Sequence, residues 1–142
     1  MKKRKLYVGC ALKFAPQKFV AAITSLRSEL KEHFDVLEFK FPHPGSDRDV
    51  YILDIKKHVA RCDLMLAICD HPSTGLGYEM ATAVEKHNKH VLCLAHTRAG
   101  PSRLILGITR RRYKFLRYSS ISEIKRLLLD FEKRRFKKSN KK

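Results

Sequence analysis

A turn rich in hydroxyl groups and glycine leads into a carboxylate near the middle of the chain. The turn Ser73-Thr-Gly-Leu-Gly77 follows the apolar run 64–69, and Glu79 falls at the start of the helix-like segment expected after Gly77. A strand-to-helix turn leaves backbone N–H groups unpaired where the helix dipole is positive, so it favours an anion such as phosphate. The alternative is that Ser73 or Thr74 is an ordinary N-cap and that Glu79 only complements the dipole.

A second carboxylate, Asp54, lies inside another helix-like segment, where aspartate is a poor helix former. Paired carboxylates beside a pocket are what cleavage of a glycosidic bond requires, because one attacks the anomeric carbon while the other handles the proton of the leaving group. Glu79 is the candidate nucleophile and Asp54 the candidate acid/base. Asp63 precedes a strand and is expected in a turn or cap, whereas Asp70 ends that strand and either lines the pocket or stabilises a turn.

Other catalytic motifs do not fit this chain. Gly75-Leu-Gly77 lacks the third glycine of a dinucleotide fingerprint, and no Walker loop is present. Ser73 has no Gly-x-Ser-x-Gly context. His90 and Cys93 have metal-like spacing but would point to opposite faces of one strand. We therefore expect neither a metal nor a cofactor.

Strand-like and helix-like segments alternate along the whole chain. Apolar runs and alternating patterns predict strands at 5–10, 34–41, 64–69, 91–95 and 113–118. Helical spacing of apolar residues predicts helices at 16–33, 49–61, after Gly77, at 102–107 and from 121 to 131. This alternation predicts an α/β fold in a single domain, with a doubly wound five-stranded parallel sheet of flavodoxin- or Rossmann-like order.

Ligands of such a fold bind at the carboxyl ends of the strands. The loops after the first, third and fourth predicted strands should meet at that edge. They would bring Lys13, the turn at 73–79, and Ser102 with Arg103 to one crevice. The predicted crevice suits a phosphate and holds carboxylates.

Composition sets the broad class. The chain has 142 residues, 44% of them hydrophobic, and a net charge of +17. We expect one domain at 1–135 and a basic, disordered tail at 136–142, since seven of the last ten residues are Lys or Arg. A basic tail can bind nucleic acid or simply keep a protein soluble. No aromatic platform or recognition helix accompanies it, so nucleic acid is not the expected primary partner.

No apolar run approaches the roughly 20 residues that span a bilayer, so no membrane association is expected. The N-terminus lacks the apolar length and cleavage site of a signal peptide. The four cysteines lie mainly in apolar runs and are expected as reduced, buried thiols. These features predict a cytoplasmic protein.

Several of these segments together resemble a known family. The resemblance is to the nucleoside 2-deoxyribosyltransferase family and, within it, most closely to the 2′-deoxynucleoside 5′-monophosphate N-glycosidases. It is carried by Asp54, Cys62-Asp-Leu-Met-Leu-Ala-Ile68, Pro72-Ser-Thr-Gly-Leu-Gly-Tyr-Glu79, Ala83-Val84 and Val91-Leu-Cys-Leu94. It covers roughly 6–118 and is strongest between 54 and 107.

The resemblance implies a role for each matching residue. Glu79 matches a nucleophile that forms a covalent glycosyl–enzyme intermediate, and Asp54 matches the group that protonates the departing base. Tyr7 matches a tyrosine close to the sugar. Ser73 matches a serine that binds the 5′-phosphate, where transferases acting on free nucleosides tend to carry Asp. Ser102 matches a serine lent by the neighbouring subunit, which implies a homodimer with shared active sites.

Lys13, Gly75 and Gly77 complete the expected substrate-binding set, but the chain departs from the family after the first strand. Relatives have a Gly-Ser-Ile type of turn there, whereas this chain has Cys10-Ala-Leu and so loses a hydroxyl at Ala11. Lys13 stands where an arginine is common, and it supplies charge without a bidentate fork.

The expected function is hydrolysis of the N-glycosidic bond of (2′-deoxy)nucleoside 5′-monophosphates, a small-molecule substrate, through a covalent glycosyl-Glu79 intermediate. The products would be the free base and (deoxy)ribose 5-phosphate. One alternative is a 2-deoxyribosyltransferase, in which a second base replaces water. Another is a non-catalytic, basic protein that binds nucleotides or nucleic acid.

Overall fold

A single parallel sheet forms the centre of the computed structural model, which describes residues 2–37 and 40–137. Its strands are β1 (Lys5–Cys10), β2 (Asp35–Val36), β3 (Leu64–Ile68), β4 (His90–His96) and β5 (Tyr113–Tyr118). They are ordered β2-β1-β3-β4-β5, and every neighbouring pair is parallel. This is the flavodoxin-like order, and it confirms the predicted doubly wound α/β fold.

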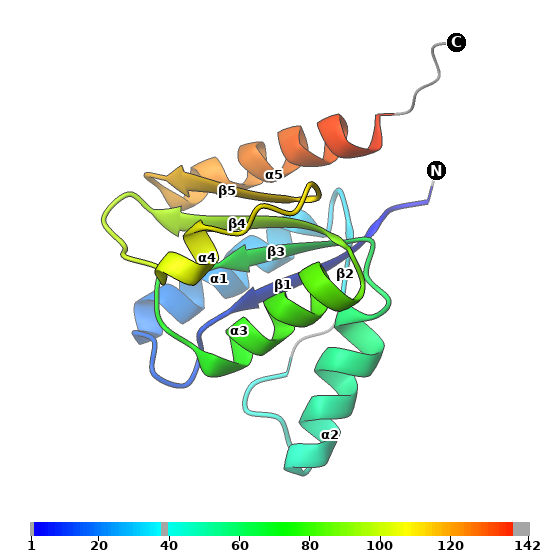
Figure 1. Ribbon diagram of the computed structural model, residues 1–142. Helices are drawn as coiled ribbons and strands as arrows, with labels where there is room; N and C mark the ends of the chain where they lie inside the picture. Colours follow the sequence, from blue (N-terminus) through cyan, green and yellow to red (C-terminus); the bar gives the residue numbers. More distant parts are fainter. Residues whose placement is uncertain (1, 38–39, 138–142) are drawn as a thin grey trace.

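Helical segments connect the strands. They are α1 (Gln17–Leu30), α2 (Asp47–Tyr51) with its π-helical continuation η1 (Ile52–Val59), α3 (Thr74–Ala81) with η2 (Thr82–Lys86), α4 (Arg103–Leu106) and α5 (Ile121–Phe136). In Figure 1, α1 lies behind the strands and α3 in front of them. The arrowheads of β1, β3, β4 and β5 point to one side of the picture, and both termini lie on the other.

Alternation along β1 decides which side chains meet which helices. Leu6 and Val8 pack in one core cluster with α1 and α5, while Tyr7 packs in the other with η1, α3 and η2. Successive side chains of a strand point to opposite faces of a sheet, which accounts for the division. Tyr7 therefore faces the two helices that carry Asp54 and Glu79.

The edge strand β2 is shorter than predicted. The expected strand at 34–41 reduces to Asp35–Val36, which pairs only with Lys5 and Leu6 of β1. An edge strand has one neighbour, so its apolar alternation alone does not extend the ladder. Residues 38 and 39 of the predicted strand lie outside the described part of the chain.

The helix that carries Asp54 begins at a capping box. The Ser46 hydroxyl accepts a hydrogen bond from the Asp49 amide at 3.2 Å, and the Asp49 carboxylate accepts one from the Ser46 amide at 3.0 Å. The helix accordingly starts at Asp47, two residues before the predicted position. Its later turns are π-helical, and the Ala60 amide reaches the Ile55 carbonyl at 3.0 Å.

The helix that carries Glu79 also begins earlier than predicted, at Thr74 rather than after Gly77. The reason is the Ser73 hydroxyl, which accepts a hydrogen bond from the Leu76 amide at 3.1 Å and so caps the helix. Gly75 and Gly77 thus lie inside its first turns, and Glu79 lies in the second turn rather than the first.

No helix in the described ranges is long and apolar enough to cross a membrane. Helix α5 continues through Phe136, and residues 138–142 of the predicted basic tail lie outside the described residues. All four cysteines are free thiols, and three of them are buried.

Candidate active site

The side chains of Tyr7, Asp54 and Glu79 come together from three separate elements. The Tyr7 hydroxyl donates a hydrogen bond to Glu79 Oε2 at 2.6 Å. The carboxyl groups of Asp54 and Glu79 are also hydrogen-bonded to each other. The cluster forms because η1 and α3 pack on the face of the sheet to which Tyr7 of β1 points.

Burial and proximity change the protonation of this carboxyl pair. Burial raises the pKa of Glu79 to about 7; the hydrogen bond from Tyr7 opposes the rise, and the charge of Asp54 adds to it. Burial also raises the pKa of Asp54, against the opposing effect of His58. Because two carboxylates in contact repel each other, the pair retains one shared proton up to about pH 7. One protonated and one ionised carboxyl are what an acid and a nucleophile require.

Tyr7 acts in this cluster as a neutral hydrogen-bond donor. Burial raises the pKa of its hydroxyl far above the usual range, and the negative charges of Glu79 and Asp54 raise it further. The short bond to Glu79 stabilises the ionised form of that carboxyl.

Arg27 is a site residue that the sequence analysis missed. Its side chain is buried, and Nη2 donates a hydrogen bond to the Val8 carbonyl at 2.6 Å. Burial lowers the pKa of the guanidinium, while the carboxyl groups of Glu79 and Asp54 oppose that effect. The sequence carried one signal, because Arg27 follows the buried Ile23 by four residues and so lies on the core face of α1.

His58 lies next to Asp54 and Tyr7, and the sequence analysis did not identify it either. It is buried, with Nδ1 3.9 Å from Asp54 Oδ1, and its ring centroid lies 5.5 Å from that of Tyr7. Its position four residues after Asp54 on the same helix was the available signal.

Gly9 is required by the close approach of Glu79 to the strand. A Cβ atom at this position would lie 2.9 Å from Leu76 Cδ1 and 3.1 Å from Glu79 Oε1. A side chain at this position would require the ends of the Leu76 and Glu79 side chains to move. Nothing in the sequence distinguishes this glycine, because the contact is made with residues about 70 positions away.

The carboxyl pair lines a cavity of about 490 Å³. This volume falls within the range of about 300–1,000 Å³ typical of small-molecule sites. Lys13 from the loop after β1, and Lys40 and His43 from the segment before α2, contribute polar and basic groups to its wall. The cavity thus combines an ionisable carboxyl pair with positive charge, as a phosphorylated substrate requires.

Three of the predicted substrate-binding residues line a different cavity. Ser73, Gly77 and Ser102 border a hollow of about 660 Å³ between α3 and α4, and neither Asp54 nor Glu79 lines it. The single crevice predicted for the three loops is therefore wrong for an isolated chain. The reason is α3 itself, whose first turns separate its capping end from Glu79.

The two predicted phosphate-binding serines make local contacts in this structure. Ser73 caps α3, and the Ser102 hydroxyl accepts a hydrogen bond from the Leu104 amide at 3.1 Å. Gly75 is exposed, and a Cβ there would meet only Ser73 Oγ, at 3.8 Å. A Cβ at Gly77 would meet nothing within 4 Å. Neither Gly75 nor Gly77 is therefore required to be glycine by a close contact.

The other candidate carboxylates have structural partners. Asp63 accepts a hydrogen bond from the Lys5 amide at 2.7 Å, as expected of a turn residue before β3. Asp70 accepts hydrogen bonds from the His96 amide and the Tyr118 hydroxyl, at 3.0 and 2.5 Å. Within the described residues, no group of three or more His, Cys, Asp or Glu side chains is placed to hold a metal ion.

Comparison with known proteins gives matches in both sequence and structure, although no protein-family model matches the chain. A protein of Nematostella vectensis, whose name gives a predicted activity as a 2′-deoxynucleoside 5′-phosphate N-hydrolase, is 28% identical over 119 residues. The match covers 81% of this chain and 80% of that protein.

Two solved structures share the fold. A CMP N-glycosidase from Clostridium botulinum superposes with a TM-score of 0.72 at 22% identity, over 89% of this chain and 99% of the other. A 2-deoxyribosyltransferase from Leishmania mexicana does so with a TM-score of 0.52 at 18% identity, over 65% and 64%. The predicted resemblance of this chain to the nucleoside 2-deoxyribosyltransferase family is thereby confirmed.

Proposed function

We propose that this protein hydrolyses the N-glycosidic bond of (2′-deoxy)nucleoside 5′-monophosphates. The observation that carries the proposal is the hydrogen-bonded pair Asp54–Glu79, held by Tyr7 in the wall of a 490 Å³ cavity. The names of the similar proteins support it, since one is named for a predicted 2′-deoxynucleoside 5′-phosphate N-hydrolase activity and a structural neighbour is a CMP N-glycosidase. The chain therefore resembles enzymes of this kind.

The first half of the reaction uses the single proton of the carboxyl pair. In the free protein the proton resides on Glu79, because the hydrogen bond between the two groups raises the pKa of Glu79 and lowers that of Asp54. As the sugar enters, this proton passes to Asp54. The Glu79 carboxylate then attacks C1′ of the sugar, and the bond between C1′ and the base nitrogen breaks with its electrons leaving on the base. Asp54 donates its proton to that nitrogen, so the base departs neutral. A glycosyl ester on Glu79 and an ionised Asp54 remain.

The second half restores the site. The Asp54 carboxylate accepts a proton from a water molecule, whose oxygen attacks C1′ as the ester bond to Glu79 breaks. The product is (deoxy)ribose 5-phosphate, and the pair again holds one proton. Arg27 and Tyr7 favour the ionised form of Glu79 as it leaves, through charge and through the 2.6 Å hydrogen bond.

Substrate must separate the two carboxyls. In retaining glycosidases the two groups are about 5–5.5 Å apart, with the anomeric carbon between them. Asp54 and Glu79 are in direct hydrogen-bond contact. When the sugar enters, the hydrogen bond between Asp54 and Glu79 therefore breaks, and each carboxyl contacts the substrate instead. Asp54 is the carboxyl expected to move, because about a third of its side chain is exposed and it lines the cavity.

The proposed phosphate contacts come from Lys13 in this cavity and from Ser102 of a second copy of the chain. Two exposed leucines support such a homodimer, since Leu104 and Leu106 directly follow Ser102 and are 78% and 41% exposed. Burial of these side chains at an isologous interface would place each Ser102 beside the other subunit. Ser73, which caps α3 of the same chain, remains a predicted contact of the 5′-phosphate.

The proposal is tested by incubating the full-length protein with ribo- and deoxyribonucleoside 5′-monophosphates and measuring the free base by chromatography. Glu79→Gln is expected to lower the rate by at least about a thousandfold, because the neutral amide cannot form the ester. Glu85→Gln is the matched control, since Glu85 lies on η2 and pairs with Arg110 on the surface. Near-normal base release by Glu79→Gln would refute the assignment.

A transferase shares the first half of this reaction, so the second half must be tested separately. A free base added during turnover of a different deoxynucleotide would be incorporated into a new nucleotide by a transferase. The hydrolase proposed here yields sugar phosphate in an amount equal to the base released, whether or not the second base is present.

A further inference from the structure

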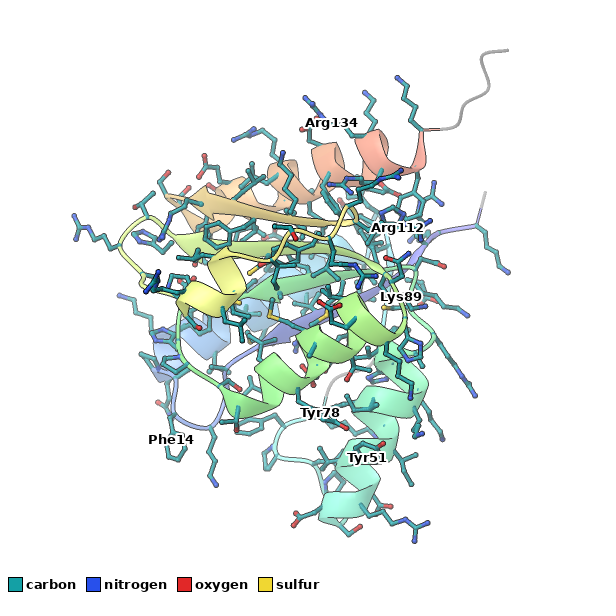
Figure 2. All side chains as sticks on the ribbon, viewed as in Figure 1. Phe14, Tyr51, Tyr78, Lys89, Arg112 and Arg134 are labelled. Carbon is teal, nitrogen blue, oxygen red and sulfur yellow. The ribbon has the colours of Figure 1, made fainter. Side chains whose placement is uncertain are left out.

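The amino ends of the strands form a second charged region, at the edge of the sheet opposite the carboxyl pair. Basic residues precede β1, β4 and β5 there and continue onto the end of α5. We call this region the amino-edge face and define it by Arg4, Lys89, Arg111, Arg112, Arg134 and Arg135. Figure 2 shows Lys89, Arg112 and Arg134 along one side of the molecule, with Phe14 on the opposite side.

Hydrogen bonds and a cation–π contact hold these segments together and orient the cations. Arg135 Nη1 donates to the Arg111 carbonyl at 2.7 Å, and Arg112 Nη1 donates to the Asn88 carbonyl at 3.2 Å. Arg4 lies 4.0 Å over the Phe136 ring, which joins the start of the chain to the end of α5. A guanidinium has five N–H donors, so one bond to a carbonyl orients the group without exhausting its capacity for phosphate.

The electrostatic effect of this charge is visible in the histidines of the same edge. Burial lowers the pKa of His90 to about 4, and the positive charges of Arg112, Arg135 and Arg4 lower it further. The pKa of His87 is lowered by burial and by Lys89 and Lys86 as well. Cations that precede β1, precede β5 and end α5 thus all act on His90. This is expected where the positive charges form one continuous surface.

Acidic residues near the face offset only part of this charge. Glu132 accepts from Arg4 at 2.9 Å, and Asp130 lies 3.1 Å from Arg134. Lys89, Arg111 and Arg112 add positive charge between these pairs. The face therefore stays positive over the stretch that joins β4, β5 and the end of α5.

The positions of the exposed apolar side chains indicate which kind of polyanion the amino-edge face can bind. The large hydrophobic residues that are well exposed in the described part of the chain are Phe14, Phe41, Tyr51, Tyr78, Leu104 and Leu106. None of them belongs to the amino-edge face. Membrane surfaces hold proteins by apolar insertion as well as charge, and single-stranded nucleic acid is held by stacking on aromatic rings. The Phe136 ring at this face is only partly exposed, and Arg4 and His90 pack against it. A face of oriented guanidinium groups without a well-exposed aromatic or aliphatic side chain fits the phosphates of a duplex.

We propose that the amino-edge face binds the sugar–phosphate backbone of double-stranded nucleic acid without reading its bases. The amino-edge face shares no residue with the carboxyl pair or with the cavity that the pair lines. The two sites are therefore separate, and the proposed binding does not rest on the proposed hydrolysis.

The test measures fluorescence anisotropy of a labelled 20-base-pair DNA duplex with the full-length protein between 50 and 200 mM salt. The triple variant Lys89→Gln/Arg112→Gln/Arg134→Gln is expected to bind at least about tenfold more weakly. Because each lost phosphate contact reduces the salt slope by about 0.9, the slope should fall by between about two and three. The far-ultraviolet circular dichroism spectrum and the thermal unfolding midpoint should not change, which shows that the variant is folded.

A charge-matched control separates the face from net charge alone. The triple variant Lys18→Gln/Arg48→Gln/Arg98→Gln removes three exposed cations from α1, α2 and the loop after β4, and it is expected to keep the wild-type slope. Equal weakening by both variants would overturn the proposal, as would loss of binding only when Lys138, Lys141 and Lys142 are replaced by Gln.

Three further ligands test the chemistry of the partner. An RNA duplex of equal length should bind with a similar slope, because the contacts are to phosphate. Single-stranded DNA should bind more weakly than the duplex. Tighter binding of the single strand, or binding of anionic lipid vesicles but not of the duplex, would overturn the assignment to double-stranded nucleic acid.

Discussion

The hydrogen bond from Tyr7 to Glu79 is the contact whose removal the structure predicts in most detail. Tyr7→Phe keeps the ring in the core and deletes only the hydroxyl that donates to Glu79 Oε2 at 2.6 Å. That bond lowers the pKa of Glu79 against the larger effect of burial. A hydrogen bond to a charged group contributes about 1.5–3 kcal/mol, and 1.36 kcal/mol corresponds to one pKa unit. The pKa of Glu79 should therefore rise by about one to two.

The pH–rate profile reports this change because the active form of the pair carries one proton. In the wild type, kcat/KM should fall as pH rises through about 7, where the last shared proton leaves and the base can no longer be protonated. In Tyr7→Phe this limb should move upward by about one to two pH units. The proton should also favour Glu79 over Asp54, so the maximum kcat/KM should fall by about 10- to 100-fold.

Tyr118→Phe is the matched control, since its buried hydroxyl also donates to a carboxylate, Asp70, at 2.5 Å. Asp70 does not line the cavity of the carboxyl pair. The control should unfold at lower denaturant concentration than the wild type but keep its pH profile. A Tyr7→Phe profile whose upper limb stays in place, or moves to lower pH, would refute the account of the pair.

Three other substitutions have definite expected outcomes. Because the pKa of Glu79 is raised from 4.5 to about 7, its ionisation destabilises the fold as pH rises through that window. Glu79→Gln should therefore gain up to about 3 kcal/mol in urea unfolding at pH 8 and nothing at pH 4; an equal gain at both would contradict burial as the cause. Gly9→Ala should lower kcat/KM by at least about tenfold by displacing the Glu79 carboxyl. Unchanged kinetics would show that β1 moves instead of Glu79. Ser73→Asp should shift the ratio of kcat/KM from monophosphates towards free nucleosides by about a hundredfold, whereas an unchanged ratio would remove Ser73 from the phosphate site.

The centre of the sheet was predictable because β3 and β4 are buried on both faces. The continuous apolar runs at 64–69 and 91–95 can be accommodated only in the centre of a parallel sheet, and both form strands there. The strand expected at 34–41 has one neighbour and shrinks to two residues. Patterns of hydrophobicity record burial, so they are informative at the centre of the sheet and weak at its edge.

The carboxyl pair was found because Asp54 and Glu79 are chemically unusual where they stand. Their roles, and those of Lys13, Ser73 and Ser102, stay predictions. Arg27 and Gly9 were missed for a different reason, since each acts through a contact with residues far along the chain. The division of the loops between two cavities was also hidden, because it depends on where α3 starts. One hydroxyl, that of Ser73, decides that start.

The central claim is that Glu79 forms a covalent bond to the sugar, and mass spectrometry of acid-quenched reactions tests it directly. Wild-type protein mixed with excess nucleotide and quenched during the first turnover should carry one (deoxy)ribose 5-phosphate on the peptide that contains Glu79. The adduct should form at the rate of base release and decay as sugar phosphate appears. Full release of base within one turnover, with Glu79 unmodified at every time point, would contradict the mechanism.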